Sequence, residues 1–370
     1  MENPSQLSTL VVMLGLLIGA IFGAVVHKTN FCAMGAVSDV VNMGHWARMR
    51  MWLLSIAVAI LGVSALASAG MLDPGQSFYT SERFTWLSFI VGGLLFGVGM
   101  TLASGCGSKN LVRLGGGNMK ALLVMLMLAV AAYMTMKGAL APLRVHVLEP
   151  VSIYFPGGQD LPRILASGFG IDLAIARWAA AFLLAGAMLV FVFRDGEFRR
   201  DRDGLLGSVV VGTMIVAGWY VTGVLGYLNE HPDTLEEAFL ATNSRRPESL
   251  TYVGPVAYTL ELGLLWTDTS LRMTFGIAAV LGTLAGSFCY ALATRNFRWE
   301  GFTSAADMRN HIVGGFLMGF GGVIGLGCTI GQGITGFSTL ALGSILVFFC
   351  IVAGAALTMK WQYQRLLRES

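Results

Sequence analysis

Three of the five cysteines stand beside interruptions in long apolar segments. Cys32 occurs in "NFCAMGA", Cys106 in "SGCGSKNLVRLGGGN" and Cys328 in "GLGCTIGQGITG". A thiol is a weak S–H donor with a soft, polarisable sulfur atom, so it suits a soft sulfur-bearing ligand better than a hard ion. Cys289 and Cys350 lie within uninterrupted apolar segments, where a cysteine usually acts as a small buried hydrophobe. The pattern therefore predicts that Cys32, Cys106 and Cys328 line a substrate path.

The residues around these three cysteines favour an anionic ligand. A helix that begins after each interruption leaves N–H groups unpaired, and these carry about half a positive charge and form an anion site. Residues 310–359 contain no Asp, Glu, Lys or Arg, so an anion near Cys328 must rely on backbone donors and on polar side chains there, among them Thr329 and Thr335. Near Cys106, Lys109 and Arg113 either assist anion binding or mark the cytoplasmic surface. The residues expected to support anion binding are Asn30, Gly105, Gly107, Lys109, Arg113, Gly327 and Gln332.

The composition places the interruptions in a membrane. The chain of 370 residues is 55% hydrophobic and 12% charged, against roughly 25% charged in soluble domains. Stretches long enough to cross about 30 Å of hydrocarbon as helices occur along the whole chain. They cover residues 9–26, 51–72, 84–104, 119–140, 174–193, 205–228, 271–292, 312–331 and 337–359. We expect an all-α polytopic integral membrane protein of one domain, residues 1–370, with about nine transmembrane helices and with helix breaks or re-entrant segments at the Gly/Cys motifs.

The distribution of Lys and Arg predicts the orientation, because cytoplasmic loops carry an excess of both. Residues 194–203, "RDGEFRRDRD", contain four arginines, and residues 295–309 contain three. Residues 141–173 are proline-rich with few arginines, and residues 229–250 mix acidic and basic side chains, so both are expected outside. Threading nine spans through these loops places the N-terminus outside and the C-terminus in the cytoplasm.

Two pairs of motifs indicate a diverged internal repeat, with halves of roughly 1–140 and 205–370. Residues 92–106, "GGLLFGVGMTLASGC", match residues 314–328, "GGFLMGFGGVIGLGC", at an offset of 222. Residues 29–38, "TNFCAMGAVS", match residues 295–304, "RNFRWEGFTS", more weakly, with Cys32 aligned to Arg298. In the threading above, the two Gly-Cys motifs end spans of opposite direction, which would suit an inverted repeat around a midplane site.

The motifs "NFCAMGA", "SGCGSKNLVRLGGGN" and "GLGCTIGQGITG" resemble those of the YeeE/YedE membrane proteins, and the resemblance runs over most of the chain. It implies uptake of thiosulfate or a related sulfur-containing anion, passed through S–H to sulfur hydrogen bonds from Cys328 on the outer side, through Cys106, to Cys32 on the cytoplasmic side. It also implies a small cytosolic partner of the TusA sulfur-carrier type. The family includes members linked to selenium compounds, which these motifs do not separate.

Other functions remain open from the residues. Cys106 could instead be the nucleophile of a membrane-bound sulfurtransferase that forms a persulfide. The small residues could serve helix packing in a structural subunit, or the path could conduct another inorganic anion or a gas. We expect a transporter that is not an enzyme, without a metal or cofactor and without nucleic acid, because the sequence has no C-x-x-C and no nucleotide-binding G-x-x-x-x-G-K-[ST]. Asp172, Glu261 and Asp268 are expected either to relay protons or to mark membrane boundaries.

Overall fold

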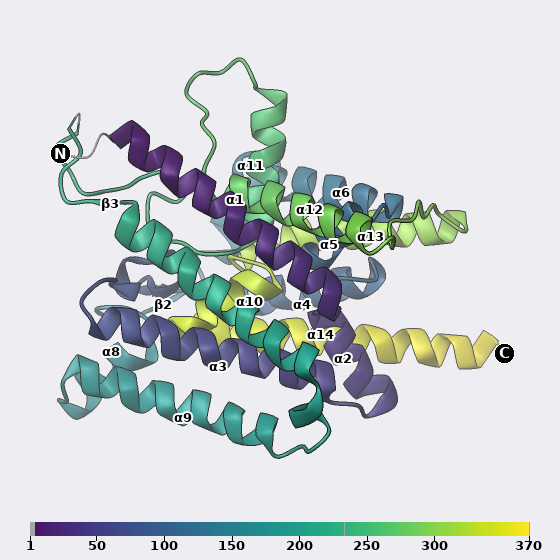
Figure 1. The fold of residues 1–370 in the computed structure, drawn as a ribbon, viewed down its shortest axis with the longest axis horizontal. Coiled ribbons are helices and arrows are strands. Elements are labelled where there is room, and N and C mark those ends of the chain that lie inside the picture. Colours follow the sequence, from purple (N-terminus) through teal and green to yellow (C-terminus); the bar gives the residue numbers. More distant parts are fainter. Residues whose placement is uncertain (1–3, 233, 370) are drawn as a thin grey trace.

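Long helices form most of the chain in the computed structural model, which describes residues 4–232 and 234–369 (Figure 1). Their apolar, alanine- and glycine-rich sequences favour helices whose backbone polar groups are all paired internally, as a membrane requires. The long helices are α1 (Pro4–Thr29), α3 (Ala47–Ser68), α4 (Trp86–Leu102), α6 (Met119–Lys137), α9 (Leu173–Phe193), α10 (Arg202–Tyr220), α12 (Phe275–Ala293), α13 (Ala305–Ile324) and α14 (Leu342–Glu369).

Short helices and strands connect the long ones. Short helical segments are α2 (Ala33–Ser38), η1 (Asp39–Met43), η2 (Pro74–Gln76), η3 (Phe78–Thr80), α5 (Gly107–Gly115), α7 (Ala141–Leu143), η4 (Arg144–Leu148), α8 (Leu161–Phe169), η5 (Phe198–Arg200), η6 (Val221–Leu225), α11 (Val253–Leu264) and η7 (Gly331–Gly336). The structure also has four two-residue strands in two antiparallel pairs. β1 (Arg83–Phe84) pairs with β2 (Ile153–Tyr154), and β3 (Tyr227–Leu228) pairs with β4 (Ala238–Phe239).

The helices confirm a polytopic membrane protein. Over the described part of the chain, eight helices are long and apolar enough to cross a membrane, one fewer than the nine spans expected. The expected span at 312–331 is the one that differs. There, α13 begins earlier, at Ala305, includes Asp307 and Arg309, and ends at Ile324, so that residues 325–328 form a break.

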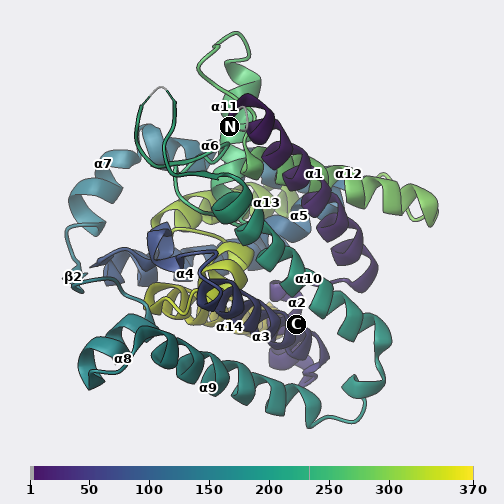
Figure 2. The same ribbon diagram turned by 60° about the vertical axis from the view of Figure 1, so that its left-hand side comes forward.

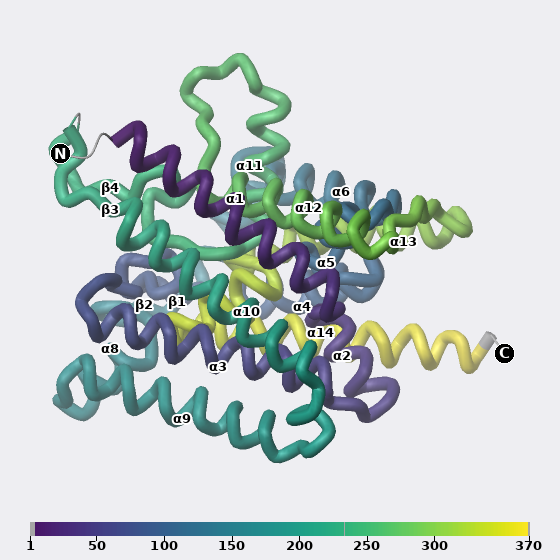
Figure 3. Tube along the Cα trace, viewed as in Figure 1, coloured from purple at the N-terminus to yellow at the C-terminus, as the bar shows by residue number. Residues whose placement is uncertain are grey.

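The two ends of the chain lie at opposite ends of the helical array (Figures 1 and 3). The arginine-rich connections at 194–203 and 295–309 lie at the end that carries the C-terminus, whereas the connections at 141–173 and 229–250 lie at the end that carries the N-terminus (Figure 1). Turning the molecule shows α9 and α8 along one edge and the α4, α13 and α14 helices in the interior (Figure 2). All loops predicted to share one side of the membrane therefore lie together.

Helices α4 and α13 pack around a local two-fold axis formed by the matched glycines. A Cβ atom added to Gly92 would lie 2.7 Å from the Gly321 oxygen, and one added to Gly314 would lie 2.6 Å from the Gly99 oxygen. Gly92 aligns with Gly314 and Gly99 aligns with Gly321 at the offset of 222, so each contact is repeated with the halves exchanged. The two helices run antiparallel, which is the geometry of an inverted pair.

A further pair of glycines matched at the offset of 222 contacts the neighbouring helices of α4 and α13. Gly97 of α4 approaches Ile351 of α14, and Gly319 of α13 approaches Leu128 of α6, in each case with a close backbone oxygen. These contacts are the ones expected if the α4–α6 and α13–α14 segments are equivalent parts of an inverted repeat, which stays a prediction.

The second matched pair does not share this axis. Gly15, Gly19 and Gly23 of α1 approach Phe275, Ala279 and Thr283 of α12 in the same order, so α1 and α12 are parallel. An inverted relation would make equivalent helices antiparallel. The similarity between residues 29–38 and 295–304 therefore does not belong to the inverted repeat of the Gly-Cys motifs.

The α1–α12 contact supplies a test of the packing. A Cβ atom on Gly286 would lie 1.9 Å from the Ala20 oxygen, whereas nothing lies within 4 Å of one on Gly186 in α9. Because overpacking costs about 1–3 kcal/mol, we expect Gly286→Ala to lower the thermal unfolding midpoint in detergent by several degrees and Gly186→Ala to leave it unchanged. Equal midpoints for the two variants would contradict this close contact.

Candidate functional site

The three cysteine breaks share one backbone geometry. The residue two positions before each cysteine has a left-handed conformation, with φ of 51° at Asn30, 55° at Ser104 and 57° at Leu326. Two of the breaks have the hydrogen bond typical of a helix that ends in a left-handed residue. Gly105 N donates to the Met100 oxygen at 2.9 Å, and Gly327 N donates to the Gly322 oxygen at 2.7 Å. The chain thus leaves one helix, turns, and presents a cysteine at the start of the next.

Two of the three cysteine sulfur atoms, those of Cys32 and Cys328, accept a hydrogen bond from the helix that follows, whereas Cys106 makes no such bond. Cys32 precedes α2, and its Sγ accepts a hydrogen bond from Gly35 N at 3.4 Å. Cys328 Sγ likewise accepts from Gly331 N at 3.4 Å. Because each sulfur uses a lone pair on the backbone, its S–H hydrogen remains available as a donor.

The breaks bring the thiols of Cys32 and Cys106 together. These side chains lie within hydrogen-bonding reach of each other, although they are far apart in sequence. Cys106 Sγ also lies 3.4 Å from Ser108 Oγ and beside the side chain of Thr329, the residue after Cys328. The Thr329 hydroxyl is buried and has no hydrogen-bond partner. The sulfur atoms therefore follow one another from α2, through the start of α5, to the break before η7.

This line of thiols lies between two pockets. Cys32, Cys106 and Cys328 are free thiols that expose 5%, 1% and 0% of their surface, so protein atoms close the space around them. Asn30, two residues before Cys32, lines one pocket together with Lys109. Gly327, directly before Cys328, lines the other pocket. The three thiols thus lie between residues that line the two pockets.

The first of these, the Lys109 pocket, is cationic. Its volume is about 320 Å³, and its charged or titratable lining side chains are His27, Lys109, Arg113, Arg298 and Glu300. Lys109 Nζ donates to Asn30 Oδ1 at 3.0 Å, and Arg113 Nη1 donates to the Ser104 oxygen at 3.0 Å. Within residues 4–232 and 234–369, no carboxylate forms an ion pair with either side chain. The sequence-predicted residues Asn30, Lys109 and Arg113 therefore meet in one pocket that suits an anion.

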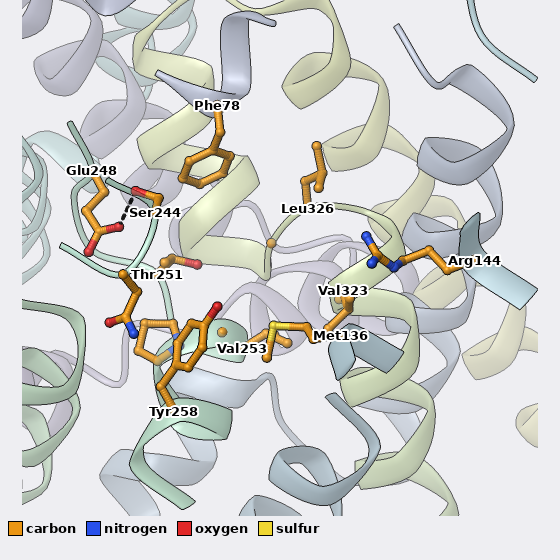
Figure 4. Close-up of a pocket in the computed structure, with 15 residues that line it drawn as sticks. Phe78, Met136, Arg144, Ser244, Glu248, Thr251, Val253, Tyr258, Val323 and Leu326 are labelled. Carbon is orange, nitrogen blue, oxygen red and sulfur yellow. Dashed lines mark hydrogen bonds between the residues drawn. The ribbon is translucent and has the colours of Figure 1, made fainter. Parts of the chain in front are cut away.

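The second, the Glu248 pocket, has a volume of about 240 Å³ and is shown in close-up in Figure 4. Its lining includes Arg144 and Glu248, from the connections at 141–173 and 229–250, which lie at the end of the molecule that carries the N-terminus (Figure 1). Glu248 and Ser244 stand on one side, joined by a hydrogen bond from Ser244 Oγ to Glu248 Oε2 at 2.7 Å, and Arg144 stands on the other (Figure 4). Arg144 Nη1 donates to Glu149 Oε1 at 2.7 Å, but its Nε is buried and unpaired. The pocket therefore contains a cation, hydroxyl groups and one carboxyl group.

Gln332 and Thr335 lie in η7, just after the third break, and their hydrogen-bond donors are already paired with backbone oxygens. Gln332 Nε2 donates to the Gly325 oxygen at 2.7 Å, and Thr335 Oγ1 donates to the Leu250 oxygen at 2.6 Å. Gln332 Oε1 is a buried acceptor with no partner. In this conformation these side chains hold the break together, and the role predicted for Gln332 in anion binding stays a prediction.

The predicted glycines occupy the turns themselves. Gly105 pairs with the preceding helix, Gly107 is the first residue of α5, and Gly327 lines the Glu248 pocket. A Cβ atom on Gly107 would meet Leu128 at 3.4 Å, an ordinary van der Waals contact. Close approach to a neighbour therefore does not by itself require glycine at position 107.

Several pocket residues were not predicted from the sequence. Glu248 and Arg144 lie in loops that carry mixed charges, where the sequence pattern does not distinguish a buried side chain from an exposed one. Arg298 had a weak signal, since it aligns with Cys32 in the second matched pair. Glu300 accepts a hydrogen bond from Asn118, the residue that caps the start of α6. This hydrogen bond holds the Glu300 carboxylate beside the Lys109 pocket.

The acidic residues considered as proton relays lie elsewhere. Asp172 caps α9, Asp268 hydrogen-bonds to Ser270 in an exposed turn, and Glu261 pairs with Lys137 at 2.8 Å. None of them lines either of the two pockets. Cys289 is exposed on α12, and Cys350 packs against Gly93, so both lie outside the line of thiols.

The chain is similar to known sulphur-transport proteins. The profile of a family described as sulphur transport matches residues 28–357. The thiosulfate transporter TsuA of Escherichia coli K12 is 28% identical over 329 residues, which cover 87% of this chain and 86% of the relative. The thiosulfate transporter TsuA of Spirochaeta thermophila is 25% identical over 358 residues, which cover 94% and 97%. The matched region includes all three cysteine breaks and, except for His27, the residues that line both pockets, and the chain belongs to the YeeE/YedE family of sulphur-transport membrane proteins.

Proposed function

We propose that this protein is an uptake transporter for thiosulfate. The observation that carries the proposal is the line of three buried thiols between two pockets, at breaks whose local geometry is the same. The names of the two relatives, which cover most of the chain, support thiosulfate as the substrate.

The chemistry of thiosulfate fits this site. The ion has hard sulfonate oxygens at one end and a soft terminal sulfur at the other, so it needs both charge compensation and soft contacts. The Lys109 pocket and the N–H groups at the start of α5 supply positive charge, and the S–H groups supply weak donors to sulfur. Hydrogen bonds to charged groups contribute about 1.5–3 kcal/mol each, so a few at each thiol offset partial dehydration without trapping the ion. Successive weak sites favour passage.

The direction of uptake follows from the proposed orientation. The Glu248 pocket faces the outside, the Lys109 pocket faces the cytoplasm, and the anion passes Cys328, Cys106 and Cys32 in that order. The arginine-rich loops near the C-terminal end support a cytoplasmic location for that end in a bacterial inner membrane (Figure 1). On this side a small sulfur-carrier protein of the TusA type would accept the substrate, and membrane lipids cover the exposed apolar helices.

The surroundings of Cys106 favour transport over sulfur transfer. A nucleophilic cysteine is commonly activated by an adjacent general base, in addition to any nearby cation such as Lys109. In the described residues no His, Asp or Glu side chain hydrogen-bonds to Cys106, whose neighbours are Cys32, Ser108 and Thr329. Because no such base contacts Cys106, we propose that the protein does not act as an enzyme.

Growth on thiosulfate tests the function. A bacterial strain that lacks its own sulfate and thiosulfate uptake would receive the wild-type gene, with thiosulfate as the sole sulfur source. We expect growth, and we expect radiolabelled thiosulfate to accumulate in the cells. Failure of a membrane-inserted wild-type protein to support growth on thiosulfate, together with growth on another sulfur or selenium compound, would overturn the thiosulfate assignment.

A further inference from the structure

Glu248 is a carboxyl group in the wall of a pocket that, under the proposed function, receives a divalent anion. Its side chain is buried, with only 7% of the residue exposed. Ser244 Oγ donates to its Oε2, and its peptide N–H donates to Thr222 Oγ1 at 3.1 Å, so both the carboxyl group and the backbone are held in place. No Lys, Arg or His forms an ion pair with Glu248 in the described ranges.

The groups that face Glu248 do not neutralise its charge. Tyr79 of η3 and Tyr258 of α11 interact with it electrostatically, and both are neutral as phenols. Gly276 of α12 and Thr222 of η6 approach it and have no titratable side chain. Arg144 of η4 stands on the opposite side of the pocket (Figure 4) and pairs with Glu149. Burial therefore raises the pKa of Glu248 to about 7, despite hydrogen bonds from Ser244 and Asn243.

The charge state of this group decides what the pocket can hold. An ionised Glu248 would place a carboxylate beside a dianion in a cavity of about 240 Å³, where water screens the repulsion poorly. A protonated Glu248 adds an O–H donor to the hydroxyl groups of the pocket and leaves Arg144 as its charge. Binding of the anion and binding of a proton therefore favour each other, because linkage is reciprocal.

We propose that Glu248 is the proton-binding residue of the Glu248 pocket and that thiosulfate enters this pocket together with one proton. The proposal rests on the proposed function and adds to it a proton dependence of substrate recognition. It assigns the proton to Glu248, which lines the pocket, and leaves Glu261 with its partner Lys137 outside the route.

Uptake at two external pH values tests the proposal. Thiosulfate stays a dianion near neutrality, so a pH effect there must come from the protein. If only protein with a protonated Glu248 accepts the anion, the KM for thiosulfate rises about tenfold between external pH 6 and pH 8, because the fraction of protein in which Glu248 is protonated falls about tenfold. The interior of the vesicles is held at one pH, so that His27 in the Lys109 pocket does not titrate.

Two variants separate the role of Glu248 from a general effect of pH. Glu248→Gln keeps a neutral side chain at both pH values, and we expect its KM to be the same at both and close to that of the wild type at pH 6. Glu230→Gln changes an exposed carboxyl group of the same loop and is expected to keep the tenfold rise. A rise in Glu248→Gln equal to that of the wild type, or no rise in the wild type, overturns the proposal.

If Glu248→Gln fails to reach the membrane, the number of protons that the wild-type protein takes up per thiosulfate bound tests the proposal instead. Calorimetric titration of the detergent-solubilised protein with thiosulfate at pH 8, in buffers of different ionisation enthalpy, is expected to show uptake of about one proton per anion. Binding without proton uptake overturns the role of Glu248 and leaves the proposed function intact. Absence of thiosulfate binding at every pH between 6 and 8 would instead count against the proposed function.

Discussion

Replacing Cys106 with alanine is expected to reduce thiosulfate uptake to the background of cells without the transporter. Cys106 lies between the Cys32 thiol and Thr329, and it exposes only 1% of its surface. Alanine would leave a buried apolar gap at the centre of the line of thiols. Loss of one hydrogen bond to a charged ion, about 1.5–3 kcal/mol, slows passage at this point by roughly 10- to 100-fold, before any loss of hydrogen bonding to Cys32.

Initial rates of radiolabelled thiosulfate uptake, at equal amounts of protein in the membrane, would measure this effect. Cys350→Ala is the matched control, because Cys350 is a partly buried thiol on α14 that packs against Gly93 away from the path. Its uptake is expected to equal that of the wild type. Cys106→Ser keeps a donor but replaces the soft sulfur, so partial activity is expected. Wild-type rates in Cys106→Ala would remove the thiol from the path.

The sequence predicted the cysteine breaks well because their signals are local. Glycines and polar residues that interrupt an apolar helix indicate a turn wherever they occur, and the positions of Cys32, Cys106 and Cys328 at helix starts follow from that. The threading of nine spans predicted opposite directions for the helices that end at the two Gly-Cys motifs, and α4 and α13 are antiparallel in the structure. Their close approach requires small residues at equivalent positions, which the matched glycines supply.

Contacts between segments that are far apart in the chain could not be predicted from the sequence. Nothing near Cys32 indicates that its thiol reaches Cys106, because the contact depends on how α2 and α5 pack. The similarity of residues 295–304 to residues 29–38 suggested a shared origin, but the parallel packing of α1 and α12 contradicts an inverted relation. Glu248 was missed for a related reason: a mixed-charge loop is usually exposed, and only the fold buries this one side chain.

The cationic character of the Lys109 pocket has the second large expected effect. Lys109 lies one helical turn after Cys106, donates to Asn30 Oδ1 at 3.0 Å, and interacts electrostatically with both Cys32 and Cys106. Its charge is not neutralised by an ion pair in the described residues, so it is available to an anion that leaves the thiols. Lys109→Gln keeps a polar side chain and removes the charge, and we expect the rate of uptake to fall about tenfold, which corresponds to about 1.4 kcal/mol.

A second lysine at the same end of the molecule separates this local effect from a general loss of positive charge. Lys28 is exposed at the end of α1 and pairs with Asp203 at 2.8 Å, outside the residues that line the Lys109 pocket. Lys28→Gln changes the net charge by the same amount, and because exposed ion pairs contribute little, its uptake is expected to match the wild type. Raising the salt concentration should weaken the difference between the two variants only slightly, since the anion meets Lys109 in a confined pocket where screening is limited. Equal losses in Lys109→Gln and Lys28→Gln would mean that net charge at this end, and not a contact in the pocket, controls the rate.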